Sequence, residues 1–250
     1  MARLGLGVGL TRRGGGGDAA PGIPTIASSV YWLDATDAST VSRRSDTGVD
    51  YVSEIRDRLG GTTKLAQGEG SLQPSLSVAG LNGLNAIDFT GDDKALFNET
   101  DFMPSASSSF VFVMRSTDTR SILLTGGGGN RAVGIIDSGS STATHVGSGS
   151  GADSPLTFIG GVPLSPATRG ALYTGTTGAT SIVVVRGANT NVSGDEWTEI
   201  RLCDYTGSAT FDYTGLIGEF VAMNAPTTAE LNALGAYLAT KWGASWTDIT

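Results

Sequence analysis

Short strand-like segments separated by turn residues constrain the fold of this chain more than any other feature. Over residues 28–224, segments such as SSVYWLDA, TSIVVVRG and LIGEFVAMN are rich in Val, Ile, Phe and Tyr, and clusters of Gly, Asp, Asn or Ser bound most of them. Apolar side chains alternate at Phe110, Phe112 and Met114, which predicts a strand with one buried face. The segment RGALYTG, residues 169–175, fits the same strand pattern. The pattern predicts an all-β sandwich, for which 250 residues are sufficient.

One segment near the C-terminus has the pattern of a helix. In APTTAELNALGAYLATKWG, Thr227 is placed as the N-cap and Glu230 follows three residues later, which is the spacing of a capping box. Gly243 stands where a helix commonly ends on a glycine. The apolar residues that would line one face are Leu231, Leu234, Leu238 and Trp242. We expect this helix to cover a sheet or to close its edge.

Residues 1–25 form an N-terminal arm and tether, and residues 26–250 form the sandwich domain. The arm begins with apolar residues that alternate with glycine, namely Leu4, Leu6, Val8 and Leu10. Arg12, Arg13 and four glycines follow, and a glycine-rich tether is flexible until something binds it. The alternation suits pairing with the sheet edge of another chain, so we expect the arm to bind a partner protein.

Charge is unevenly distributed between the arm and the domain. The chain has a net charge of -8, which argues against nucleic acid as a partner. Residues 1–17 hold three arginines and no acidic residue, so the remainder carries -11. A basic arm on an acidic body favours association with a neighbouring copy, and we expect a homo-oligomer or many copies on one assembly.

The sequence offers no segment for a membrane or for secretion. No apolar run approaches the ~18 residues that cross a bilayer, so a membrane is not an expected partner. Glycine interrupts the apolar N-terminal residues at every second position, and Arg12 and Arg13 follow them instead of preceding them, which does not fit a signal peptide. We expect the protein to be made in a cytoplasm.

Few residues are suited to metal binding or nucleophilic chemistry. Cys203 and His145 are the single cysteine and histidine, which excludes a disulfide framework and zinc sites built on several Cys or His. We expect Cys203 to be a buried strand thiol and His145 a polar strand or loop residue. Asp92 and Asp93 are weak candidates for calcium, with a solvated turn as the alternative. No cofactor is expected.

Glycosidase chemistry needs two carboxyl groups about 5–9.5 Å apart. Glu99 and Asp101 stand two residues apart, but their segment has the composition of a loop. No G-x-S-x-G motif is present. We therefore expect a protein that is not an enzyme. Trp197 and Trp246 are weak candidates for stacking on a sugar ring, whereas Trp32 and Trp242 are expected in the core.

Three segments together resemble a known superfamily. They are YWLDATDASTV, then IRDRLGGTTKLAQGEGSLQPSLSVAGLNGLNAIDFTGDDKALF, then LIGEFVAMNAPTTAELNALGAYLATKWG. Over residues 29–243 the chain resembles the concanavalin A-like lectin/glucanase superfamily, in the laminin G-like version found in bacteriophage and bacterial proteins. The resemblance implies a jelly-roll sandwich of two antiparallel sheets with the helix packed outside. Glucanase members carry a closely spaced E-x-D-x-E-type strand that this chain lacks. Lectin members often have a calcium-supported loop site, for which only Asp92 and Asp93 are candidates.

The function expected from these features depends on the arm. The glycine-alternating start is similar to the N-termini of small phage virion proteins. We expect a non-enzymatic structural component of a phage particle: a capsid decoration, head-fibre or tail-attached protein. Its arm would bind other virion proteins, and its lectin-like domain would be displayed. The alternative is a carbohydrate-binding host-adhesion module whose partner is a cell-surface glycan.

Overall fold

The structure is a computed structural model of the chain. The residues that it describes are 23–91, 93–98, 108–126, 132–145, 156–188, 200–203 and 213–250. Several predicted site residues lie outside these ranges. They are the arm residues Leu4, Leu6, Val8, Leu10, Arg12 and Arg13, together with Asp92, Glu99, Asp101 and Trp197.

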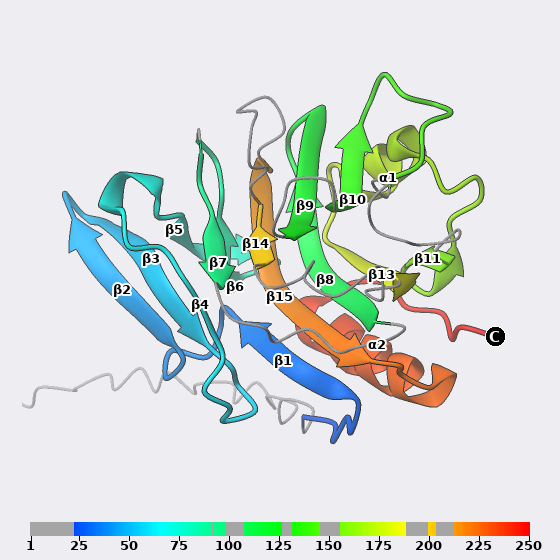
Figure 1. Cartoon of the computed structure of the whole chain (residues 1–250), viewed down its shortest axis with the longest axis horizontal. Helices are drawn as coiled ribbons and strands as arrows, with labels where there is room; N and C mark the ends of the chain where they lie inside the picture. Colours follow the sequence, from blue (N-terminus) through cyan, green and yellow to red (C-terminus); the bar gives the residue numbers. More distant parts are fainter. Residues whose placement is uncertain are drawn as a thin grey trace, which may run out of the picture.

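Strands are the main regular secondary structure of the described residues, and they hydrogen-bond in one continuous series (Figure 1). The strands are β1 (Ser29–Asp34), β2 (Val41–Asp46), β3 (Val49–Arg56), β4 (Lys64–Ala66), β5 (Ser75–Leu81), β6 (Leu84–Asp88), β7 (Leu96–Asn98), β8 (Ser108–Ser116), β9 (Arg120–Gly126), β10 (Ala132–Asp137), β11 (Leu156–Ile159), β12 (Val162–Pro163), β13 (Ser181–Ala188), β14 (Ile200–Leu202) and β15 (Gly215–Asn224). Every pairing between these strands is antiparallel, which confirms the expected all-β class.

The series of strands folds over into a two-layered, jelly-roll-like sandwich. Its order is β10-β9-β14-β7-β4-β3-β5-β6-β15-β8-β13-β11-β12, with β1 beside β15 and β2 beside β3. In Figure 1, β9, β10 and β14 lie in front of β8, β13 and β15. Leu124 and Val133 of the front layer belong to the same buried cluster as Phe112 and Phe220 of the rear layer. The ring centroids of Phe112 and Phe220 are 5.0 Å apart, so the main core lies between the layers.

Strand β8 is buried on both faces. Phe110, Phe112 and Met114 point into the core between the layers, as the alternation predicts. Val111 and Val113 point the other way, into a second buried cluster formed with the C-terminal helix. The prediction of a single buried face was therefore wrong for this strand, because a helix covers the face that alternation would leave to solvent.

The C-terminal helix α2 (Thr228–Trp242) confirms the prediction from its caps. Thr227 Oγ1 accepts a hydrogen bond from Glu230 N at 3.2 Å, and Glu230 Oε2 accepts one from Thr227 N at 2.9 Å. The helix ends at Gly243, which has the left-handed conformation with φ 60° and ψ 30°. The four predicted apolar residues, Leu231, Leu234, Leu238 and Trp242, are at most 1% exposed and pack against the outer face of the sandwich.

A second helix, α1 (Arg169–Thr176), replaces the strand predicted for residues 169–175. Thr168 caps it, because its Oγ1 accepts a hydrogen bond from Ala171 N at 3.2 Å. Thr176 Oγ1 donates to Leu172 O at 2.8 Å within the helix. These local hydrogen bonds outweigh the strand preference of Tyr and Thr in the segment. Among the described residues, neither helix is long and apolar enough to span a bilayer.

Candidate functional site

An open pocket of about 580 Å³ lies between the β2–β3 hairpin and the loop that contains the short 3-10 helix η1 (Gly70–Leu72). Its lining residues are Arg44, Asp46, Tyr51, Gly68, Gly70, Ser71, Gln73 and Lys94. None of them was singled out by the sequence analysis. They come from β2, β3, the η1 loop and the residues before β7, so the fold assembles the pocket from separate segments.

The hairpin brings the first two of these side chains together. Thr47 and Gly48 form its turn with φ values of 48° and 84°, and two such residues are typical of a tight type I′ connection. This turn pairs Arg44 with Tyr51 across β2 and β3. Side chains in such a pair lie on the same face of the sheet. Accordingly, Arg44 Cζ lies over the Tyr51 ring, 5.0 Å from its centroid.

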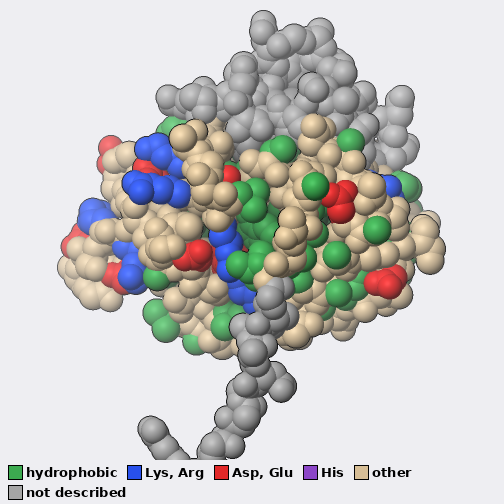
Figure 2. All heavy atoms as spheres, turned by 90° about the horizontal axis from the view of Figure 1, so that it is seen from below, with side chains coloured by type: hydrophobic (Ala, Val, Ile, Leu, Met, Phe, Trp, Pro, Cys, Tyr) green, Lys and Arg blue, Asp and Glu red, His purple; other side chains and the backbone are tan. Residues whose placement is uncertain are grey.

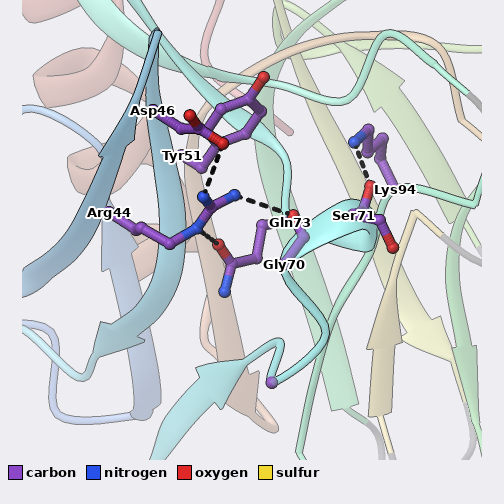
Figure 3. A pocket seen from close by; sticks show the side chains of 8 residues that line it. Arg44, Asp46, Tyr51, Gly70, Ser71, Gln73 and Lys94 are labelled. Carbon is purple, nitrogen blue, oxygen red and sulfur yellow. Dashed lines mark hydrogen bonds and ion pairs between the residues drawn. The ribbon is translucent and has the colours of Figure 1, made fainter. Parts of the chain in front are cut away.

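Arg44 ties the hairpin to the η1 loop (Figure 3). Its Nε donates to Gln73 Oε1 at 3.3 Å, its Nη1 to Asp46 Oδ2 at 3.0 Å, and its Nη2 to the Gly70 carbonyl at 3.2 Å. Gln73 is itself buried, and its Nε2 donates to the Gln67 carbonyl at 2.9 Å. The guanidinium is therefore held from three sides before any ligand binds.

Lys94 borders the same pocket from the segment before β7. Its Nζ donates to the Ser71 carbonyl at 2.5 Å and lies 5.8 Å from the centroid of the Tyr51 ring. Two cations thus lie over one aromatic ring, an arrangement that the negative face of the ring stabilises. Tyr51 is half-buried, so it forms a wall of the pocket and also holds the cations in place.

The surroundings of the pocket are rich in charge of both signs. Figure 2 shows Lys, Arg, Asp and Glu side chains gathered at the end of the molecule where Figure 1 places β2, β3 and β4. On the opposite face of the hairpin from Arg44 and Tyr51, Arg43 Nη1 pairs with Asp50 Oδ2 at 3.2 Å. Beside the pocket-lining Ser71, Glu69 Oε1 accepts a hydrogen bond from Ser71 Oγ at 3.2 Å.

A second polar cluster is buried between β1, β15 and α2. Asp34 and Glu219 face each other across β1 and β15, and both are 0% exposed. Glu219 accepts hydrogen bonds from Trp32 Nε1 at 2.5 Å and from Trp242 Nε1 at 2.8 Å. Lys241 Nζ lies 2.6 Å from Glu219 Oε1 and 2.8 Å from both oxygens of Asp34.

The charges of this cluster shift one another's protonation. Burial raises the pKa of the Glu219 carboxyl, and the nearby Asp34 raises it further, against the opposing effect of Lys241. Burial alone would lower the pKa of Lys241, but the carboxylates of Glu219 and Asp34 outweigh it and raise that pKa. Arg58 completes the cluster through an ion pair with Asp34 and a 3.3 Å hydrogen bond to the Tyr237 hydroxyl.

This cluster has a structural role. Its members include Trp32 and Asp34 of the segment YWLDA and Lys241 and Trp242 of the segment KWG, which are among the residues that carry the resemblance described above. Both carboxylates are out of reach of solvent, and cations or indole N–H groups already occupy their oxygens. The cluster holds α2 against the sheet, and it places Trp32 and Trp242 in the core as predicted.

The predicted candidates that the structure does describe are not lining residues of the pocket, although Asp93 directly precedes the lining residue Lys94. Asp93 is exposed, with φ 57°, at a turn. No group of three or more His, Cys, Asp or Glu side chains in the described ranges could hold a metal ion. Trp246 is half-buried, and its ring lies where a side chain on Gly235 of α2 would stand, with Cε2 2.1 Å from an added Cβ. Its role as a sugar platform stays a prediction.

The single cysteine and the single histidine are both buried. Cys203 follows β14 directly, which confirms the expected buried thiol. His145 is 1% exposed, and its Nε2 lies 2.7 Å from Thr157 Oγ1. Burial, together with the smaller effect of the nearby Arg169, lowers the pKa of His145 to about 4. Neither residue borders the pocket.

Comparison with known proteins gives little beyond the fold. No family model and no curated protein matches the chain. Two similar solved structures are of GH54 α-L-arabinofuranosidase: a mutant soaked with 4-nitrophenyl α-L-arabinofuranoside, and the enzyme soaked with a cyclic sulfate inhibitor. Each is 12% identical with a TM-score of 0.46, and the match covers 86% of this chain but 59% of theirs. This likeness assigns no activity to the chain.

The comparison nevertheless corrects one expectation. We withdraw the expectation that the chain is not an enzyme, because both similar structures are of a glycosidase. The spacing of carboxylates along the sequence does not exclude this chemistry, because carboxylates from different strands can converge. Asp34 and Glu219 show that strands far apart in this chain bring two carboxylates face to face.

Proposed function

We propose that the sandwich is a carbohydrate-binding domain and that it binds a saccharide in the pocket around Arg44, Tyr51 and Lys94. The observation that carries the proposal is the pocket itself, in which hydrogen-bonding side chains surround an aromatic ring. Binding sites for small molecules commonly combine an aromatic wall with a few convergent polar groups.

The lining groups match the chemistry of a saccharide. Each sugar hydroxyl both donates and accepts hydrogen bonds, and a pyranose also presents apolar C–H groups. Asp46 supplies acceptor oxygens, Arg44 and Lys94 supply donors, and Tyr51 supplies an apolar ring. Because Gln73, Asp46 and Gly70 already hold Arg44, binding loses less side-chain entropy than it would with a free arginine.

The role on a phage particle is a separate proposal. The arm that would anchor the domain to other virion proteins lies outside the described residues, and attachment to a virion stays a prediction. A carbohydrate-binding domain carried on a particle surface would serve as a host-adhesion module, with a cell-surface glycan as its partner.

Screening of the full chain on a glycan array tests the proposed function. We expect binding to a limited set of saccharides, and we expect Tyr51→Ala to weaken it at least about tenfold because it removes the wall that holds both cations. Leu59→Ala, which changes a residue 48% exposed outside the pocket lining, is the matched control and should bind as the parent does.

Two results would overturn this proposal. One is the absence of binding to any saccharide on the array. The other is unchanged binding by Tyr51→Ala, which would place the saccharide elsewhere. The thermal unfolding midpoint of each variant separates loss of the site from loss of the fold.

A further inference from the structure

The hydrogen-bonding groups of the pocket that remain available are mainly donors. An arginine side chain has five N–H groups, and Arg44 uses three of them on Gln73, Asp46 and Gly70. Lys94 has three N–H groups and uses one on the Ser71 carbonyl. Two donors are therefore left on each cation, and all belong to residues that line the pocket.

The charges that face the pocket do not cancel. Asp46 neutralises Arg44 within the lining. Arg43 and Asp50 neutralise each other on the opposite face of the β2–β3 hairpin and are not lining residues. Glu69 reaches the pocket only through the Ser71 hydroxyl. The ion pairs among the described residues leave Lys94 without a carboxylate partner. The lining residues thus carry one excess positive charge, on a chain whose net charge is -8.

We infer that the saccharide bound here is acidic and that Lys94 binds its anionic group, a carboxylate or a sulfate. The inference rests on the proposed function and specifies its ligand class. A charge-assisted hydrogen bond is roughly twice as strong as a neutral one, so a donor-rich pocket favours an anion over a hydroxyl. With the anion on Lys94, the rest of the saccharide lies against Tyr51 and the remaining N–H groups of Arg44.

Paired saccharides that differ in charge test this assignment. The full chain is titrated calorimetrically with oligogalacturonate and its methyl ester, sialyllactose and lactose, and dextran sulfate and dextran. We expect the acidic member of at least one pair to bind about tenfold more tightly than its neutral partner. The pair that shows the preference distinguishes a carboxylate from a sulfate.

Two variants locate the preference. Lys94→Gln keeps a hydrogen-bonding side chain but removes the charge, and it should reduce the acidic-to-neutral ratio to near one. Arg120→Gln removes a positive charge from β9, where Arg120 Nε lies 3.7 Å from Asp137 Oδ2, outside the pocket lining. It is the matched control and should leave the ratio unchanged.

The outcomes separate the two proposals. Equal binding of acidic and neutral members, lost in Tyr51→Ala, would overturn the acidic specificity and leave the carbohydrate-binding function standing. An acidic preference that survives Lys94→Gln would overturn the assignment to Lys94. Failure of every saccharide in the panel to bind would overturn the acidic specificity, whereas the carbohydrate-binding function is overturned only by absence of binding on the glycan array.

Discussion

At the scale of single residues, His145 couples the stability of the domain to pH. Its imidazole is buried beside Thr157, and burial lowers its pKa from 6.5 to about 4. The unfolded chain therefore binds a proton near pH 6.5, whereas the folded chain resists protonation until about pH 4. The contribution of His145 to the free energy of unfolding is therefore fully present above pH 6.5, and it is lost as the pH falls toward 4.

We expect the free energy of unfolding to fall by at most about 3 kcal/mol through this residue as the pH drops over that window. Urea denaturation of the parent and of His145→Gln at several pH values measures the effect. The difference in free energy between the two proteins should change across the window. A difference that is constant with pH would show that His145 does not titrate as inferred.

The pocket could not be predicted residue by residue. Arg44, Tyr51 and Lys94 form no recognised motif, and they lie on three segments whose proximity depends on tertiary structure. The one local signal was the turn at Thr47 and Gly48, because a tight hairpin there pairs Arg44 with Tyr51. Lys94 carries no comparable local signal.

At the scale of elements, the buried cluster around Glu219 fixes helix α2 to the sheet. Glu219 accepts from two tryptophans and pairs with Lys241, so its two oxygens serve three partners. Glu219→Gln leaves only one oxygen that can accept a hydrogen bond. Its NH₂ group, itself a donor, then faces an N–H donor of Trp32, Trp242 or Lys241. Because the substitution leaves Lys241 buried with one carboxylate partner fewer, we expect a loss of about 3 kcal/mol in the free energy of unfolding.

Glu54→Gln is the control for this prediction. Glu54 pairs with Lys64 and Arg56, whose side chains are 52% and 65% exposed, so its loss should cost less than about 1 kcal/mol. Equilibrium denaturation of both variants gives the comparison. Similar small losses in both would show that the buried cluster does not hold the helix.

The two helices show which elements a sequence can reveal. Helix α2 was predictable because its cap residues, apolar face and terminal glycine all agree. Helix α1 was not, because it is short, rich in Thr and Gly, and stabilised by the Thr168 cap and by backbone contacts within its own turns. Strand β8 was identified from its residue types, but its second buried face depends on α2.

At the scale of the whole molecule, the residues that stabilise the two-layered sandwich and the residues that line the pocket lie in different places. The core and the Glu219 cluster lie between the layers and beneath α2, whereas the pocket lies at the end formed by β2, β3 and the η1 loop. The overall class followed from the strand pattern. The placement of the pocket did not, because it depends on which loops the strand order brings together.

NMR spectroscopy of the ¹⁵N-labelled chain during titration with the best-binding saccharide shows whether the saccharide binds in this pocket. We expect the largest amide shift changes at Arg44, Tyr51, Gly70, Ser71 and Lys94, and no change in the amides of α2 and β9. Shift changes centred elsewhere on the domain, with these five residues unaffected, would show that the saccharide does not bind in this pocket.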